Sequence, residues 1–258
     1  MAGDLNIVAN VASLLIYRTQ YGRIAVKKLT ITLFLAVGAL SLLGCNNRHQ
    51  PVEQALQPMQ QSYQGVLPCA DCSGLDTSLF LDSDGTFILK EIYRGSAHAG
   101  DNNEGDQTFA EYGKWARTAD KLVLTNGQGE KRYFRPVGKN LVMLDQQGLA
   151  IKSTLNYQLT PSDQPLPKTP MPLSGMYKYF ADAAVFTDCA TGRTFPVENN
   201  IALETGYLKA RKKVGEPVFL TLNGHFDVRP SMEEGQSDKT LIPADNIKFN
   251  ASKSCASK

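Results

Sequence analysis

Proline is concentrated in one short stretch of this 258-residue sequence. Between Thr160 and Pro172, five of thirteen residues are proline, at positions 161, 165, 167, 170 and 172. Proline cannot donate a backbone hydrogen bond, so such a stretch fits neither a helix interior nor a central strand. We therefore expect a stiff linker over residues 161–172 that separates two domains, at 63–160 and 173–258.

The first half of the chain reads as all β. From Tyr63 to Leu159, short apolar runs alternate with turn residues, and no helical period is present. The strongest turn signal is Asp82-Ser83-Asp84-Gly85, which lies between the runs Leu75–Leu81 and Thr86–Tyr93. A polar loop follows at 95–107, and further strands are expected at 109–116, 121–125, 131–135, 141–144 and 157–159. Short strands joined by tight turns predict a small up-and-down barrel.

The second half predicts a smaller β domain with one helix. Strand signals lie at 175–187, 193–197, 217–222, 225–229 and 239–242, and a helix-like segment lies at 201–211. This set suits a small OB-like barrel, while a different barrel or a sandwich would also accommodate it. The predicted fold class is therefore all-β, with two small barrels.

An export signal precedes these domains. Lys27-Lys28 is followed by fifteen uncharged residues, Leu29 to Leu43, and then by Gly44-Cys45. A basic region, a short apolar region and a small residue at the cut describe a secretory signal. Fifteen residues are short for a membrane-spanning helix, which needs roughly 20. Leu42-Leu43-Gly44-Cys45 resembles a bacterial lipobox, so we expect cleavage before Cys45 and acylation of Cys45.

Residues 1–25 do not fit a signal peptide, because they place a second apolar run ahead of the basic pair. Translation that starts at Val26 accounts for this, with a signal peptide at 26–44; a genuine extension of 25 residues is the rival reading. Residues 45–62 contain Gln and Pro with no periodic pattern, and they are expected to form a flexible tether. Asn46 follows the acylated cysteine in place of aspartate, which favours the outer membrane.

Charge and motifs exclude several function classes. Without the four basic residues and one acidic residue of 1–44, the chain carries 23 basic and 24 acidic side chains. A near-neutral chain without basic clusters offers no footprint for nucleic acid. No P-loop, nucleophile elbow, zinc-protease motif or dinucleotide fingerprint occurs. We therefore expect no enzyme.

Four cysteines remain once Cys45 is acylated: Cys69, Cys72, Cys189 and Cys255. An even number in an oxidising compartment implies two disulfides, with three possible pairings. The domain boundary favours Cys69–Cys72 and Cys189–Cys255. The second would close a much longer loop and would therefore stabilise its domain more. If either bond senses redox state, the long one is favoured.

Cys69-Ala70-Asp71-Cys72 also invites a catalytic reading. In dithiol oxidoreductases such a motif lies at a helix N-terminus, which lowers the thiol pKa. Here Pro68 precedes it, Gly74 follows it, and strands flank both. A structural or regulatory disulfide is therefore the favoured interpretation. A third is Cu(I) binding by Cys69 and Cys72 when reduced, because soft thiolates select that metal.

Several strings identify a family resemblance. These are Gly65 to Cys72 (GVLPCADC), Tyr112 to Thr125 (YGKWARTADKLVLT), Gly175-Met176-Tyr177 and Phe186 to Arg193 (FTDCATGR). They resemble the NlpE family, also called CutF, of copper-resistance and envelope-stress lipoproteins. The resemblance covers nearly the whole chain from Val26, which supports a start at that residue.

The resemblance implies a lipocalin-like N-terminal barrel joined to a C-terminal OB-fold. It also implies activation of the Cpx envelope-stress pathway through its inner-membrane sensor histidine kinase, in response to surface contact, lipoprotein mis-sorting, disulfide failure or copper. Cys45 would carry the acyl chains, and Cys69–Cys72 and Cys189–Cys255 would be oxidised by the periplasmic disulfide-forming machinery. The expected location is the outer membrane, at its periplasmic face or partly at the cell surface. No cofactor is required, although copper or a small apolar ligand in the first barrel is the alternative function; a thiol–disulfide oxidoreductase ranks below both.

Overall fold

The computed structural model describes residues 61–96, 105–118, 120–231 and 237–255. The described residues belong to one compact unit, which contains two β-barrels. The predicted signal peptide, the acylation site Cys45 and the tether up to residue 60 lie outside the described residues. Among the described residues, no helix has the length and hydrophobicity needed to cross a membrane.

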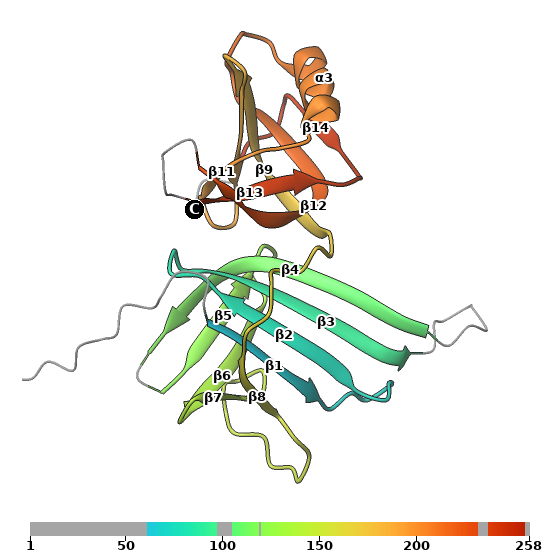
Figure 1. Ribbon diagram of the computed structural model, residues 1–258, viewed down its shortest axis with the longest axis vertical. Helices are drawn as coiled ribbons and strands as arrows, with labels where there is room; N and C mark the ends of the chain where they lie inside the picture. Colours follow the sequence, from blue (N-terminus) through green and yellow to red (C-terminus); the bar gives the residue numbers. More distant parts are fainter. Residues whose placement is uncertain (1–60, 97–104, 119, 232–236, 256–258) are drawn as a thin grey trace, which may run out of the picture. The chain divides into compact units, whose positions relative to one another are not determined.

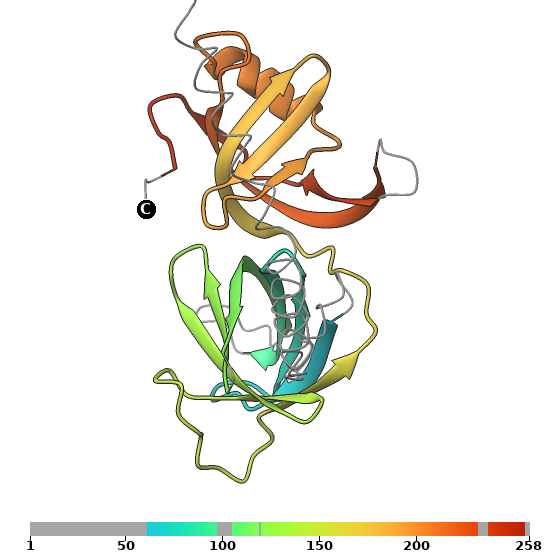
Figure 2. The ribbon, with the colours of Figure 1, turned by 90° about the vertical axis from the view of Figure 1, so that its left-hand side faces the viewer.

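The first barrel is closed and antiparallel throughout (Figures 1 and 2). Each strand pairs with its neighbours in sequence, and the last strand pairs with the first. Its strands are β1 (Gln61–Leu67), β2 (Leu75–Leu81), β3 (Thr86–Ser96), β4 (Gly105–Arg117), β5 (Leu122–Asn126), β6 (Lys131–Val137), β7 (Asn140–Met143) and β8 (Gln158–Ser162). The predicted up-and-down barrel is therefore confirmed. The predicted loop at 95–107 is shorter than expected, because β3 and β4 extend into it.

Alternating side chains fill the interior of this barrel. Leu79 and Leu159 are fully buried, and Phe87 and Leu89 are 1% exposed. The interior cluster consists of Leu67, Leu75, Leu79, Leu81, Phe87, Leu89, Leu122, Leu124, Phe134, Leu141 and Leu159. Burial of one such side chain contributes about 1.5–3 kcal/mol, so this cluster is the main source of barrel stability.

The predicted tether and the predicted proline-rich linker are both shorter in the structure than the sequence suggested. Gln61 and Ser62, predicted as tether, belong to β1, and Pro161, predicted as linker, belongs to β8. Pro161 lies opposite Tyr63 in a pairing of only three residue pairs, near the end of β8. The missing N–H of proline is tolerated there because the pairing ends beside it. Met171 and Pro172 likewise begin the next strand.

The second barrel is a curved six-stranded sheet with one helix (Figure 1). A parallel bridge between Val197 and Leu241 brings its two edges together. The strand order is β11-β10-β9-β12-β13, and β14 pairs with β12. The elements are β9 (Met171–Phe180), β10 (Ala183–Asp188), β11 (Thr194–Pro196), α3 (Ile201–Ala210), β12 (Val218–Pro230), β13 (Ser237–Pro243) and β14 (Lys248–Asn250).

Three details of this half were wrong in the sequence reading. The single strand expected at 175–187 is a β9–β10 hairpin, whose turn residues Ala181 and Asp182 have φ values of 50° and 61°. The two strands expected at 217–222 and 225–229 are one strand, β12. Strand β14 was not predicted. The described residues nevertheless form the predicted all-β pair of barrels, with one helix among them.

The core of the second barrel extends onto the outer face of the first. Its largest buried side chains are Tyr177, Phe186, Tyr207 and Phe226. Phe80, Ile88 and Tyr112 belong to the same cluster, although they lie on β2, β3 and β4. These three are adjacent across the sheet, and Phe80 and Ile88 alternate along their strands with side chains that fill the first barrel. The two barrels therefore share buried apolar surface.

Candidate functional site in the loop that carries Cys189

The described residues contain two disulfides, and they are the pairs that the domain boundary favoured. Cys69 is bonded to Cys72 with a Cα–Cα distance of 5.4 Å, and Cys189 is bonded to Cys255 with a Cα–Cα distance of 5.2 Å. The second pair is 66 residues apart in the sequence. The first closes a tight loop, whereas the second ties the chain beyond β14 back to the β10–β11 loop.

The Cys69–Cys72 loop joins β1 to β2 and contains no helix. Cys69 packs against the interior cluster of the first barrel. With the two sulfur atoms bonded to each other, neither is a thiolate that could bind Cu(I). No group of three or more His, Cys, Asp or Glu side chains suited to a metal ion occurs in the described part of the chain. The oxidised loop therefore does not itself fit a copper site.

The Cys189 loop, residues 189–193, is held by the carboxylate of Asp188. That carboxylate accepts hydrogen bonds from the backbone N–H of Thr191 at 2.7 Å and from its hydroxyl at 2.8 Å. The backbone N–H of Cys189 donates to the carbonyl of Ser174 at 2.9 Å. Burial raises the pKa of Asp188 above its usual value, although the hydrogen bonds from Thr191 oppose this effect. The loop therefore has a fixed conformation at both of its ends.

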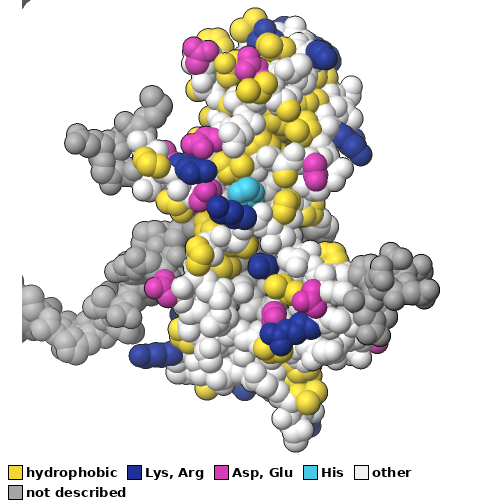
Figure 3. All heavy atoms as spheres, turned by 45° about the vertical axis from the view of Figure 1, so that its right-hand side comes forward, with side chains coloured by type: hydrophobic (Ala, Val, Ile, Leu, Met, Phe, Trp, Pro, Cys, Tyr) yellow, Lys and Arg dark blue, Asp and Glu magenta, His cyan; other side chains and the backbone are white. Residues whose placement is uncertain are grey.

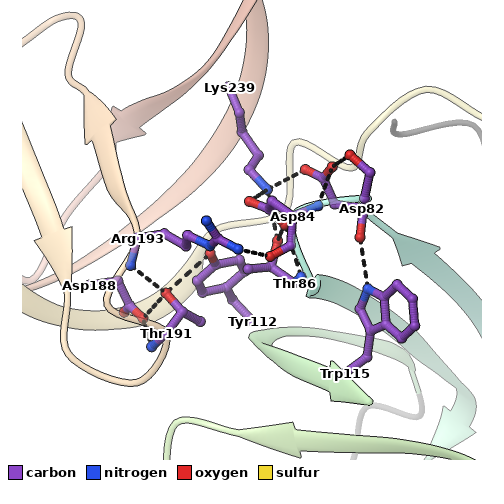
Figure 4. Close-up of polar contacts among 10 residues, drawn as sticks. Asp82, Asp84, Thr86, Tyr112, Trp115, Asp188, Thr191, Arg193 and Lys239 are labelled. Atoms are coloured by element: carbon purple, nitrogen blue, oxygen red, sulfur yellow. Dashed lines mark hydrogen bonds and ion pairs between the residues drawn. The ribbon is translucent and has the colours of Figure 1, made fainter. Parts of the chain in front are cut away.

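The same loop contacts the first barrel (Figure 4). The Tyr112 hydroxyl on β4 lies 3.4 Å from the hydroxyl oxygen of Thr191, to which it donates. The guanidinium of Arg193 donates to the backbone carbonyl of Asp84 in the β2–β3 turn. Desolvation by burial raises the pKa of the Tyr112 phenol well above its usual value. The loop that carries a disulfide cysteine is thus also a contact between the barrels.

Lys239 on β13 provides the second polar contact between the barrels (Figure 4). Its ammonium nitrogen lies 2.5 Å from a carboxylate oxygen of Asp82, 3.2 Å from one of Asp84 and 2.8 Å from the Thr86 hydroxyl. The side chains of Lys239 and Asp82 are only 10% and 12% exposed. The ammonium also lies 5.4–5.8 Å from the ring centres of three aromatic residues, Tyr112, Phe195 and Phe226. A desolvated ammonium between carboxylates and aromatic faces is strongly held.

The acidic turn that receives Lys239 is fixed by the first barrel itself. The indole N–H of Trp115 donates to the backbone carbonyl of Asp82 at 2.8 Å. Asp84 accepts hydrogen bonds from the N–H of Thr86 at 2.9 Å and from its hydroxyl. Burial raises the pKa of Asp84, but the bonds from Thr86 and the charge of Lys239 outweigh it, so the net pKa is lowered.

The sequence predicted the turn at 82–85 but not its contact with Lys239. The four disulfide cysteines were singled out, whereas Tyr112, Thr191, Arg193 and Lys239 were not. One signal was available: Leu79-Phe80-Leu81 and Phe87-Ile88-Leu89 are unbroken apolar runs rather than alternating ones. Such runs indicate strands that are buried on both faces, and hence a covered outer face of the first barrel.

Comparison with known proteins gives consistent matches over both barrels. The description "NlpE N-terminal domain" matches residues 63–154, and "NlpE C-terminal OB domain" matches residues 167–256. Lipoprotein NlpE from Escherichia coli (strain K12) is 48% identical over 238 residues, which are 90% of this chain and 98% of that relative. A crystal structure of the Cpx pathway activator NlpE from Escherichia coli is 49% identical and covers 78% of this chain and 100% of its own, with a TM-score of 0.36.

Proposed function

Because this chain belongs to the NlpE family of lipoproteins, we propose that it activates the Cpx envelope-stress pathway through the inner-membrane sensor histidine kinase of that pathway. The support is the 48% identity to a lipoprotein over nearly its full length, and a solved relative described as the Cpx pathway activator. The proposal places the chain at the outer membrane, anchored by acyl chains on Cys45. The activity is signalling rather than catalysis.

The stress signal that the geometry supports best is failed disulfide formation. The observation that carries it is the position of Cys189: its loop also holds Thr191 and Arg193, which contact Tyr112 and the Asp84 carbonyl of the first barrel. Without the bond to Cys255, this loop loses its covalent tie to the end of the chain. A population of molecules with separated barrels then rises and exposes the surfaces around Phe80 and Ile88 that the oxidised form buries.

Surface contact, lipoprotein mis-sorting and copper are proposed as further signals on the strength of the family alone. A molecule that is not acylated or not sorted would remain near the inner membrane, within reach of the kinase. The periplasmic disulfide-forming machinery would supply both bonds, so its failure and the redox signal are the same event.

A Cpx reporter assay with membrane fractionation tests the proposal. Overproduced wild type should raise reporter output only in cells that hold the kinase. Cys189→Ala/Cys255→Ala should raise output further at normal expression, with unchanged outer-membrane location, whereas the matched control Cys69→Ala/Cys72→Ala should not. Lys239→Met, which opens the contact with both disulfides intact, should resemble the first pair. If the two cysteine pairs gave equal output, the redox part would fail while pathway activation by wild type would still stand.

Copper binding is the second candidate function, and one observation supports it. Cys69 and Cys72 are close enough in the chain for both reduced thiolates to bind one Cu(I), with Met143 packed against the same cluster as Cys69. We propose that only the reduced pair binds copper. Titration of reduced protein with Cu(I) should give one site that Cys69→Ala/Cys72→Ala removes and Cys189→Ala/Cys255→Ala keeps. A small apolar ligand is disfavoured, because leucine and phenylalanine side chains fill the barrel interior, and turnover in an insulin-reduction assay should be absent.

A further inference from the structure

The expectation that the chain has no basic cluster is wrong, because four positively charged residues lie where α3 leads into β12. Lys209, Arg211, Lys212 and Lys213 fall within five residues, and Lys209, Lys212 and Lys213 are exposed. Arg211 is half-buried, and its guanidinium lies 5.7 Å from the ring centre of Tyr207. The acidic residues beside the cluster in sequence are Glu204 and Glu216. The cluster is therefore a local excess of positive charge, because the remaining residues after position 44 carry 19 basic and 24 acidic side chains.

Exposed apolar side chains lie among these charges. Leu208 is 45% exposed, Val214 is 71% exposed and Phe180 is 54% exposed. Phe180 is brought to this end by the β9–β10 turn: a Cβ atom on Gly215 would lie 3.4 Å from its ring, so the two turns touch. Figure 3 shows hydrophobic side chains exposed beside Lys and Arg side chains around the α3 end of the second barrel. We call residues 208–214 together with Phe180 the basic tip.

The contact with the Gly215 turn covers only part of Phe180, and Leu208 and Val214 are exposed as well. Leu203 and Tyr207 lie one turn apart on the same face of α3 and are fully buried in the core. Leu208 lies off that face and is exposed. The turn that presents Phe180 contains Ala181 and Asp182 in the left-handed region, where a residue with a Cβ atom is disfavoured by roughly 1 kcal/mol. The apolar character of the tip therefore suits contact with another surface.

The composition favours a membrane over a protein as that surface. Protein interfaces are enriched in arginine and in aromatic residues, phenylalanine included, and are depleted in lysine. The basic tip has three lysines, and the guanidinium of its one arginine, Arg211, already lies over the ring of Tyr207. Lysines beside exposed Phe, Leu and Val are typical of segments that lie in the headgroup region of anionic bilayers.

We propose that the basic tip binds the surface of an anionic phospholipid bilayer. The ammonium groups of Lys209, Lys212 and Lys213 would contact lipid phosphates, and Phe180 and Val214 would enter the headgroup region. This contact is independent of the acyl chains on Cys45. It would hold the second barrel against a membrane whatever the outcome of the signalling proposal.

Vesicle flotation tests this with the full chain from Asn46 on, without acyl chains. The probes are vesicles of phosphatidylcholine alone and vesicles with one third phosphatidylglycerol. Binding should be at least about tenfold stronger to the anionic vesicles and should fall steeply between low salt and roughly 0.5 M salt. Lys209→Glu/Lys212→Glu/Lys213→Glu should weaken it at least about tenfold. The matched control, Lys131→Glu/Lys139→Glu/Lys152→Glu, makes the same change in net charge at exposed lysines of the first barrel and should bind as wild type does.

Phe180→Ser/Val214→Ser should reduce binding severalfold and keep its salt dependence, because only the apolar contact is lost. Circular dichroism of every variant confirms that the fold is kept. Equal weakening by both lysine triples would overturn the proposal, since it would reduce the effect to net charge. Failure to bind either kind of vesicle would also overturn the proposal. So would the finding that the basic tip binds an acidic polypeptide such as polyglutamate but no vesicle.

Discussion

The ammonium nitrogen of Lys239 lies 2.5 Å from a carboxylate oxygen of Asp82, although the two residues are 157 positions apart and belong to different barrels. Both side chains are nearly excluded from solvent. A buried ion pair adds little compared with apolar packing, but removal of one partner leaves an uncompensated charge. This relationship makes the contact between the barrels sensitive to single substitutions.

Lys239→Met should destabilise the contact by about 2–4 kcal/mol, because Asp82 loses its buried counter-charge. Trp115 is the only tryptophan in the sequence, and its indole N–H donates a hydrogen bond to the Asp82 carbonyl. Its fluorescence therefore reports on the turn at 82–85. A double-mutant cycle with Asp82→Asn, followed by urea unfolding, should give a coupling energy of about 2 kcal/mol. Strict additivity of the two substitutions would show that the pair contributes nothing.

The two disulfides should differ in their effect on stability. Loop closure predicts about 2 kcal/mol for Cys69–Cys72 and about 4.4 kcal/mol for Cys189–Cys255. Thermal melts of Cys69→Ala/Cys72→Ala and Cys189→Ala/Cys255→Ala should therefore show the larger drop for the second pair. Coincident melting curves for the two variants would contradict the loop-length argument.

Arg132 should be far more important to the first barrel than Arg94. Arg132 makes two hydrogen bonds to Glu91, at 2.6 and 2.8 Å, and Glu91 is 4% exposed. Arg132→Ala leaves the buried Glu91 carboxylate without its counter-charge and should lower the free energy of unfolding by about 3 kcal/mol. Arg94→Ala breaks an equally short pair with Asp76, but at an exposed site, and should cost less than about 1 kcal/mol. Urea unfolding of the two variants compares them directly, and equal losses would refute the argument from burial.

Asp84 should make the protein less stable in acid. Its pKa is lowered in the folded protein, so ionised Asp84 stabilises the fold above its ordinary pKa. This stabilisation is lost as the pH falls from about 3.9, the unfolded value, through the lower folded value. Asp84→Asn should flatten the acid limb of stability against pH, whereas Asp120→Asn, at an exposed position, should not. An unchanged acid limb in Asp84→Asn would rule out this contribution.

Local signals in the sequence predicted most strands of the first barrel, because glycine and aspartate mark its turns. Gly85, for example, has a φ of 82° in the predicted Asp82–Gly85 turn. The same logic failed at Gly224, where Asn223-Gly224 was read as a break in β12. There glycine serves close packing: a Cβ atom would lie 2.8 Å from the carbonyl oxygen of Ile242. The Ala181-Asp182 turn was missed because a single aspartate, with no glycine, asparagine or proline beside it, is a weak turn signal.

The contact between the barrels lay beyond sequence reasoning. The doubled apolar runs around Phe80 and Ile88 indicate that the outer face is covered, but not by what. Lys239 is one of many lysines, and its burial depends on the positions of Asp82 and Phe226, which are far away in sequence. The domain boundary favoured one of the three possible disulfide pairings, because in that pairing each bond lies within one domain.

The connectivity of the disulfides has a consequence for biogenesis. In the exported chain that we propose, the N-terminal part leaves the translocon first, so Cys69 and Cys72 would meet the oxidant before Cys189 and Cys255 do. Each bond joins cysteines that are neighbours in the order Cys69, Cys72, Cys189, Cys255. With Cys45 acylated, an oxidase that couples each newly emerged thiol to the next one would produce the native pairs, and thiol–disulfide exchange by an isomerase would not be needed to correct them.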